Sequence, residues 1–208
     1  MMEQQILQAF ATPIGHFVFP DYESLNSELK RIILDREQSE DGIVRSNIGG
    51  WHSQGNLLSW PFPELDTFQA RLLQALQSMS NHDSQTESPV GFEVKAWANV
   101  CRYGDYHTIH NHPTGVWSGV YYIDPGSDAP GRPNSGVLEL VDPRVNIDLV
   151  GLSCSQQVRN ILCTPEEGRL VIFPSWLNHF VHPYYGEGLR ITIAFNAVPV
   201  RVHPTDRQ

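Results

Sequence analysis

Three histidines fall within six positions of the chain, in the stretch HTIHNHPTGVWSGVYY that starts at His107. His110 and His112 are separated by one residue, so in an extended backbone both rings project from the same face, close enough to share one metal ion. Imidazole nitrogens are common ligands of transition metals. Hydrogen bonding within a loop explains an isolated histidine without a metal, so the pair alone leaves both interpretations open.

A third ligand must come from another part of the chain. The stretch FPSWLNHFVHPYYGEGLR, which starts at Phe173, contains His179 and His182. A facial set of three protein ligands leaves positions open for substrate and oxygen, as in non-heme Fe(II) oxygenases. The residue spacing by itself does not choose between these two histidines.

The strand expected next along the chain has two different faces. In LRITIAFN, which starts at Leu189, side chains alternate with period two, so Arg190 and Thr192 lie opposite to Ile191 and Ile193. An inward-facing arginine needs an anionic partner, because burying an unpaired charge is costly. Either a protein carboxylate or a bound anionic ligand would supply it.

Two amphipathic helices are expected ahead of the strands. Residues 21–38 repeat apolar side chains at i, i+4, i+7 and i+8, and Asp21 is placed to cap the start. Residues 63–79 show a similar pattern, with Pro63 suited to the first turn. The polar residues 81–89 predict a linker to the second half of the chain.

The chain after Gly91 consists of short runs rich in β-branched and aromatic residues, separated by turn residues. Such strands behind two helices indicate a mostly β antiparallel sandwich or barrel with helical support on one side. We expect one domain over residues 1–208, with a helical support region at 1–90 and the sheet core at 91–200. The expected strands are residues 93–101, 116–124, 136–142, 169–174 and 189–198, with long loops at 125–135 and 142–165.

Composition restricts the partners. The chain carries 14 basic and 23 acidic residues, a net charge of -9, which disfavours binding to nucleic acid. No apolar run approaches the roughly 20 residues that span a bilayer, and the N-terminus lacks a signal-peptide pattern, so we expect a cytoplasmic protein without a membrane partner. Cys101, Cys154 and Cys163 lack CxxC spacing, which argues against a disulfide frame or a zinc ribbon. A homodimer is the default expectation for a soluble enzyme of this size.

Taken together, these motifs resemble the 2-oxoglutarate/Fe(II)-dependent oxygenases. The order is the HxH pair, the strand SGVYYI, then SGVLELVDP, GRLVIFPSWLNHFVHP and RIT. The chain is similar in particular to a bacterial and phage group of 2OG-Fe(II) oxygenases with HPxxxxSGVYY and FPSWxxHxVxP segments. The resemblance covers residues 97–196. It implies a double-stranded β-helix, the cupin-like jelly-roll barrel, in agreement with the strand-rich second half.

The resemblance also implies which residues hold the metal. His110 and His112 take the positions of the first two ligands, and His179 that of the distal one, because a short loop follows the family's distal histidine before the arginine. His107 and His182 are then expected to be loop, structural or substrate-facing residues, since such a site takes about three protein ligands.

Four further residues match positions that hold the cosubstrate. Arg190 would bind the far carboxylate of 2-oxoglutarate, a charge-assisted contact that accounts for its inward placement. Thr192 and Tyr122 would add hydroxyl groups to the same carboxylate, and Asn99 is a candidate for the other end of the molecule.

The chain departs from the wider superfamily at one ligand. Most members have HxD or HxE where this chain has His110-Asn111-His112. Three imidazoles are neutral, whereas a carboxylate would offset one charge of Fe(II), so the redox poise of the metal is expected to differ.

The resemblance therefore implies an Fe(II)- and 2-oxoglutarate-dependent dioxygenase that hydroxylates a small-molecule or peptide substrate. An alternative is a three-histidine cupin metalloprotein, either a dioxygenase that uses no keto acid or a non-catalytic binding module. Arg190 distinguishes the two hypotheses, because a metalloprotein without a keto acid needs the metal but not the arginine.

Overall fold

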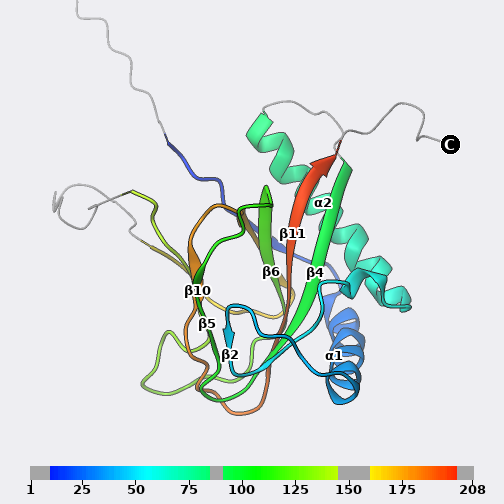
Figure 1. Cartoon of the computed structure of the whole chain (residues 1–208), viewed down its shortest axis with the longest axis vertical. Coiled ribbons are helices and arrows are strands. Elements are labelled where there is room, and N and C mark those ends of the chain that lie inside the picture. Colours follow the sequence, from blue (N-terminus) through cyan, green and yellow to red (C-terminus); the bar gives the residue numbers. More distant parts are fainter. Residues whose placement is uncertain (1–9, 85–90, 145–159, 201–208) are drawn as a thin grey trace, which may run out of the picture.

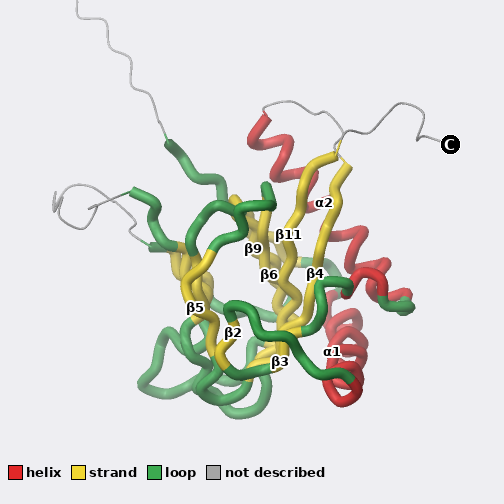
Figure 2. The backbone as a smooth tube through the Cα atoms, in the orientation of Figure 1, coloured by secondary structure: helices red, strands yellow, loops and turns green. Residues whose placement is uncertain are grey.

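The computed structural model describes residues 10–84, 91–144 and 160–200. Two antiparallel sheets face each other, and two helices lie outside one of them (Figures 1 and 2). The larger sheet has the order β1 (Gly15–Val18), β9 (Arg169–Pro174), β6 (Trp117–Asp124), β11 (Arg190–Val200), β4 (Gly91–Cys101) and β3 (Trp51–His52). The smaller sheet has the order β2 (Asn47–Ile48), β5 (Tyr106–His110), β10 (His179–Val181), β7 (Leu138–Leu140) and β8 (Ile161–Cys163). The mostly β architecture with helical support is thus confirmed.

Helices α1 (Tyr22–Ser39) and α2 (Pro63–Ser84) cover the outer face of the larger sheet (Figure 1). Their apolar stripes form one buried cluster with that sheet, which explains why both helices are amphipathic. The helix α2 begins at Pro63 as predicted, but it continues to Ser84 through the start of the expected linker, whose remainder lies outside the described residues. The expected side-chain cap at Asp21 is wrong, because this residue adopts a left-handed conformation and makes no capping hydrogen bond.

A second buried cluster lies between the two sheets, and strand alternation decides which side chains enter it. On β6, Tyr121 packs in the cluster under the helices, while Tyr122 packs between the sheets. On β11, Ile191 and Ile193 face the helices. Arg190 and Thr192 line a cavity between the sheets, as the period-two pattern predicted.

The five predicted strands correspond to β4, β6, β7, β9 and β11. The pattern missed the six other strands of the described residues, which have only two to five residues each. One of them, β8, lies inside the loop predicted at residues 142–165, of which residues 145–159 are not described. A short connecting helix (Leu57–Ser59) also precedes α2.

Cys101 and Cys163 are buried and free, and Cys154 lies outside the described residues. Among the described helices, none combines the length and the apolar character that a bilayer crossing requires.

Candidate functional site

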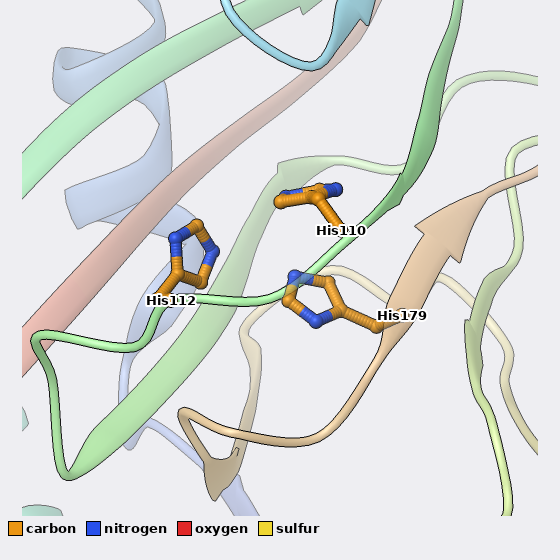
Figure 3. A group of neighbouring side chains, drawn as sticks. All are labelled: His110, His112 and His179. Atoms are coloured by element: carbon orange, nitrogen blue, oxygen red, sulfur yellow. The ribbon is translucent and has the colours of Figure 1, made fainter.

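Three histidines from the smaller sheet and its loops converge on one point (Figure 3). His110 is the last residue of β5, His112 follows in the loop, and His179 is the first residue of β10. One potential ligand atom from each ring lies within 4.8 Å of those of the other two. His179 is paired directly opposite His110 in the sheet, so the register of β5 and β10 brings distant parts of the chain together. These three are the histidines that the sequence selected.

Backbone contacts fix two of the rings. Nδ1 of His110 lies 2.7 Å from the carbonyl oxygen of Thr108, and Nδ1 of His179 lies 2.9 Å from that of Leu177. A carbonyl oxygen only accepts, so each Nδ1 carries the proton and each Nε2 keeps a lone pair. The backbone N–H of His112 donates to the carbonyl oxygen of Ser175 at 2.8 Å, which anchors the loop.

Burial keeps these imidazoles neutral. It lowers the pKa of His179 to about 3 and that of His112 to about 4, and in both cases the neighbouring His110 adds a smaller effect in the same direction. Burial also lowers the pKa of His110. At neutral pH the rings therefore present unprotonated nitrogens, the form that binds a metal.

The remaining histidines of the two motifs lie outside this group. The Nε2 atom of His182 is 2.6 Å from a carboxylate oxygen of Glu139, which gives it a structural partner. His107 is buried and lines the same cavity, and its Nδ1 is 3.4 Å from the hydroxyl of Ser46. That hydroxyl is also 3.3 Å from Nε2 of His110. No sequence signal pointed to Ser46, because only the pairing of β2 with β5 brings this part of the chain to the histidines.

Arg190 lies in the same cavity and is 1% exposed. Its Nε donates to the carbonyl oxygen of Gly136 at 3.0 Å, and no carboxylate among the described residues forms an ion pair with it. Its Nη2 atom is buried without a hydrogen-bond partner. A buried cation with an unsatisfied donor is costly, so the cavity is suited to an anionic ligand.

Of the other three predicted cosubstrate residues, Asn99 and Thr192 line the same cavity as Arg190, and Tyr122 lies beside its guanidinium. The ring centre of Tyr122 is 5.4 Å from the guanidinium carbon of Arg190, and burial raises the pKa of this tyrosine to about 12. The hydroxyl of Tyr122 and Oδ1 of Asn99 are also buried and unpartnered. Thr192 is paired opposite Asn99, whose amide lies 3.5 Å from its hydroxyl. The structure thus brings together all seven residues that the sequence selected.

The cavity continues into a wider cleft of about 760 Å³. The two spaces share Ser46, Trp97, His110 and His112 in their walls. His52, which the sequence connected to no motif, lines this cleft because β3 pairs with β4. The segment 51–63 also packs under the helices through the buried Trp51 and Trp60.

Comparison with known proteins supports these features. A family model described as "Putative 2OG-Fe(II) oxygenase" matches residues 95–196, the span that contains the three histidines and Arg190. No match was found among curated proteins.

Solved structures with the same fold include a Pseudomonas putida prolyl-4-hydroxylase, which is 17% identical, with 88% of this chain and 91% of that chain covered and a TM-score of 0.61. A prolyl hydroxylase from Trichoplax adhaerens, in complex with a hypoxia inducible factor peptide fragment, is 18% identical over 88% and 83% of the two chains, with a TM-score of 0.59. HygX from Streptomyces hygroscopicus, with nickel and 2-oxoglutarate bound, is 12% identical, with 91% of this chain and 83% of that chain covered and a TM-score of 0.58. These similarities establish the jelly-roll fold.

Proposed function

Because this chain belongs to the 2OG-Fe(II) oxygenase family, we propose that it hydroxylates a small-molecule or peptide substrate and that His110, His112 and His179 hold the iron. The combination of three converging imidazoles with a buried, unpaired Arg190 in one cavity carries this proposal. Bound Fe(II) would supply oxygen activation, so that 2-oxoglutarate, O₂ and a substrate C–H group give succinate, CO₂ and an alcohol.

The role of the three histidines rests on their geometry. The Nδ1 protons of His110 and His179 are held by backbone carbonyls, so each ring is oriented before metal arrives. His112 replaces the carboxylate of the common triad and adds no charge. Iron held by three neutral ligands keeps its full double positive charge, which favours a doubly negative keto acid in the adjoining cavity.

The role of Arg190 rests on its unsatisfied donors. An unpartnered Nη2 atom of Arg190 and the unpartnered hydroxyl of Tyr122 are a pair of donors suited to one carboxylate. The hydroxyl of Thr192 would bind the same carboxylate, and Asn99 would face the other end of the molecule. Because the pKa of Tyr122 is raised to about 12, its hydroxyl keeps its proton and remains a donor at neutral pH.

The alternative without a keto acid is a three-histidine metalloprotein of the cupin kind. The all-imidazole ligand set favours it, because nothing in that set requires 2-oxoglutarate. The buried Arg190 weighs against it, because such a protein would leave this cation without an anionic partner among the described residues.

Anaerobic titration with Fe(II) and then with 2-oxoglutarate tests the proposal. The wild-type protein should bind one Fe(II) and then develop the weak visible charge-transfer band of a keto acid chelated to iron. In Arg190→Met the iron should still bind, while 2-oxoglutarate affinity should fall about 100-fold, the effect of removing one partner of a buried charge-assisted contact. Bound iron without the band would favour the three-histidine metalloprotein.

A further inference from the structure

The wider cleft opens beside His110 and His112, which line both it and the narrow cavity of Arg190. At about 760 Å³ it is of the size that accommodates a small organic molecule. A molecule in this cleft would therefore lie next to His110 and His112 without occupying the position proposed for 2-oxoglutarate.

Two stacked aromatic rings, the partly exposed Trp97 and the buried His52, lie in one wall of the cleft. The rings of His52 and Trp97 are stacked, with their centroids 5.5 Å apart and an angle of 10° between their planes. Nδ1 of His52 is 2.7 Å from the carbonyl oxygen of Ser53, a contact that fixes the imidazole. The ring of Trp97 also approaches His112, at 5.9 Å between centroids. A partly exposed indole that is held in place by such a stack favours a planar ring as its ligand.

The charge of the cleft is opposite to that of the whole chain. Arg45 and Lys95 line it, both are exposed, and neither forms an ion pair with a carboxylate among the described residues. No Asp or Glu of the described ranges lines the cleft. In a chain with a net charge of -9, two unpaired cations at one cleft favour an anionic ligand there.

We infer that this cleft binds the prime substrate and that the substrate is an aromatic acid. Its planar ring would lie against Trp97, which His52 supports by stacking, and its carboxylate or phosphate would be received by Arg45 and Lys95. This inference rests on the proposed function, because it places the ring beside the histidines that would hold the iron. The two cations disfavour an amine of the same shape by direct repulsion.

Calorimetry with four probes of one shape tests the charge: 2-naphthoate, 2-naphthyl phosphate, the neutral 2-naphthamide and the cationic 2-naphthylmethylammonium. We expect at least one of the two anions to bind about tenfold more tightly than the amide, and the ammonium to bind most weakly, since each exposed charge contributes a factor of a few. The preferred anion identifies the acid as a carboxylate or a phosphate. An amide that bound as tightly as both anions would overturn the inference.

Matched variants test the residues. Lys95→Gln and Arg45→Gln should each lower the affinity for the preferred anion about threefold and leave the affinity for the amide unchanged. Trp97→Leu should lower the affinities for the anion and the amide equally. Arg31→Gln is the control, because Arg31 is an exposed cation on α1 that pairs with Glu28 and Asp35 away from the cleft. An equal loss in Arg31→Gln would mean that only the net charge matters and would overturn the inference.

Chemical labelling tests the location. The chain has two lysines, Lys30 and Lys95. Lys30 forms an ion pair with Asp124 on the helical side and serves as an internal control. The bound anion should slow reductive methylation of Lys95 and leave that of Lys30 unchanged. If the anion bound without protecting Lys95 but lost affinity in Arg190→Met, it would occupy the narrow cavity, and the inference would be wrong.

Binding is measured without iron or 2-oxoglutarate, and succinate release is measured separately with both present. Anion binding at Lys95 together with anion-stimulated succinate release supports the inference. Iron-dependent succinate release without preferential anion binding leaves the proposed function standing and overturns the substrate class. Anion binding without any succinate release overturns the proposed function and, with it, the assignment of the acid as a prime substrate.

Discussion

Arg190 and Gly136 are joined by a hydrogen bond in which Nε of Arg190 donates to the Gly136 carbonyl oxygen at 3.0 Å. Gly136 has a positive φ of 67°, and a Cβ atom added there would lie 3.0 Å from Cδ and 3.2 Å from Nε of Arg190. The loop before β7 thus determines where the guanidinium sits, although it is far from β11 in sequence.

Gly136→Ala should therefore weaken 2-oxoglutarate binding by about tenfold, equivalent to about 1.4 kcal/mol, because the added methyl group displaces Arg190. Gly131→Ala is the matched control, since Gly131 also has a positive φ, of 78°, but no atom lies within 4 Å of an added Cβ. Both variants should lose about 1–2 kcal/mol of stability from backbone strain. Equal 2-oxoglutarate affinities, measured by anaerobic titration, would contradict a positioning role for Gly136.

His179→Ala should release the metal. The loss in Fe(II) affinity should exceed the ~10–100-fold that follows removal of an outer-shell partner, because a direct ligand is lost. His182→Ala is the control: this neighbour contacts Glu139, so its loss should leave the iron content unchanged. Metal analysis after dialysis distinguishes the two variants, and full iron occupancy in His179→Ala would disprove the proposed distal ligand.

His112→Asp tests the unusual ligand. We expect this variant to bind Fe(II) and to retain 2-oxoglutarate turnover, because the backbone N–H of residue 112 remains anchored to Ser175 and a carboxylate is a competent iron ligand. His112→Ala, which offers no donor atom to the metal, should bind Fe(II) more weakly than the wild-type protein and more weakly than His112→Asp. A metal-free Asp variant in the same titration would show that the site accepts only three imidazoles.

Asn26 connects α1 to the sheet and should matter for stability alone. Its side chain donates to the carbonyl oxygen of Ile123 at 3.2 Å and accepts from the hydroxyl of Tyr121 at 2.7 Å, both in the buried interior. Asn26→Ala should lower the free energy of unfolding by about 2 kcal/mol, because these groups lose their partner. The exposed Ser39→Ala should change it by about 0.5 kcal/mol or less. Denaturant midpoints measure both, and 2-oxoglutarate affinity should be unchanged in each.

The longest local patterns were predicted well. The apolar repeats of α1 and α2 and the alternation on β11 reflect burial of one face, which the sequence records directly. Asp21 shows the limit of such reasoning, because its residue type suits a cap while its backbone adopts a different conformation. The short strands escaped detection because two to five residues are too few to establish a period.

The spacing of His110 and His112, and the place of Arg190 on a largely apolar strand, are local features that can be read along the chain. The surroundings of these residues depend on the three-dimensional fold. The pairing of β5 with β10 sets His179 opposite His110, and the pairing of β3 with β4 stacks His52 on Trp97. Contacts between strands distant in sequence depend on sheet register, and no short segment of the chain encodes that register alone.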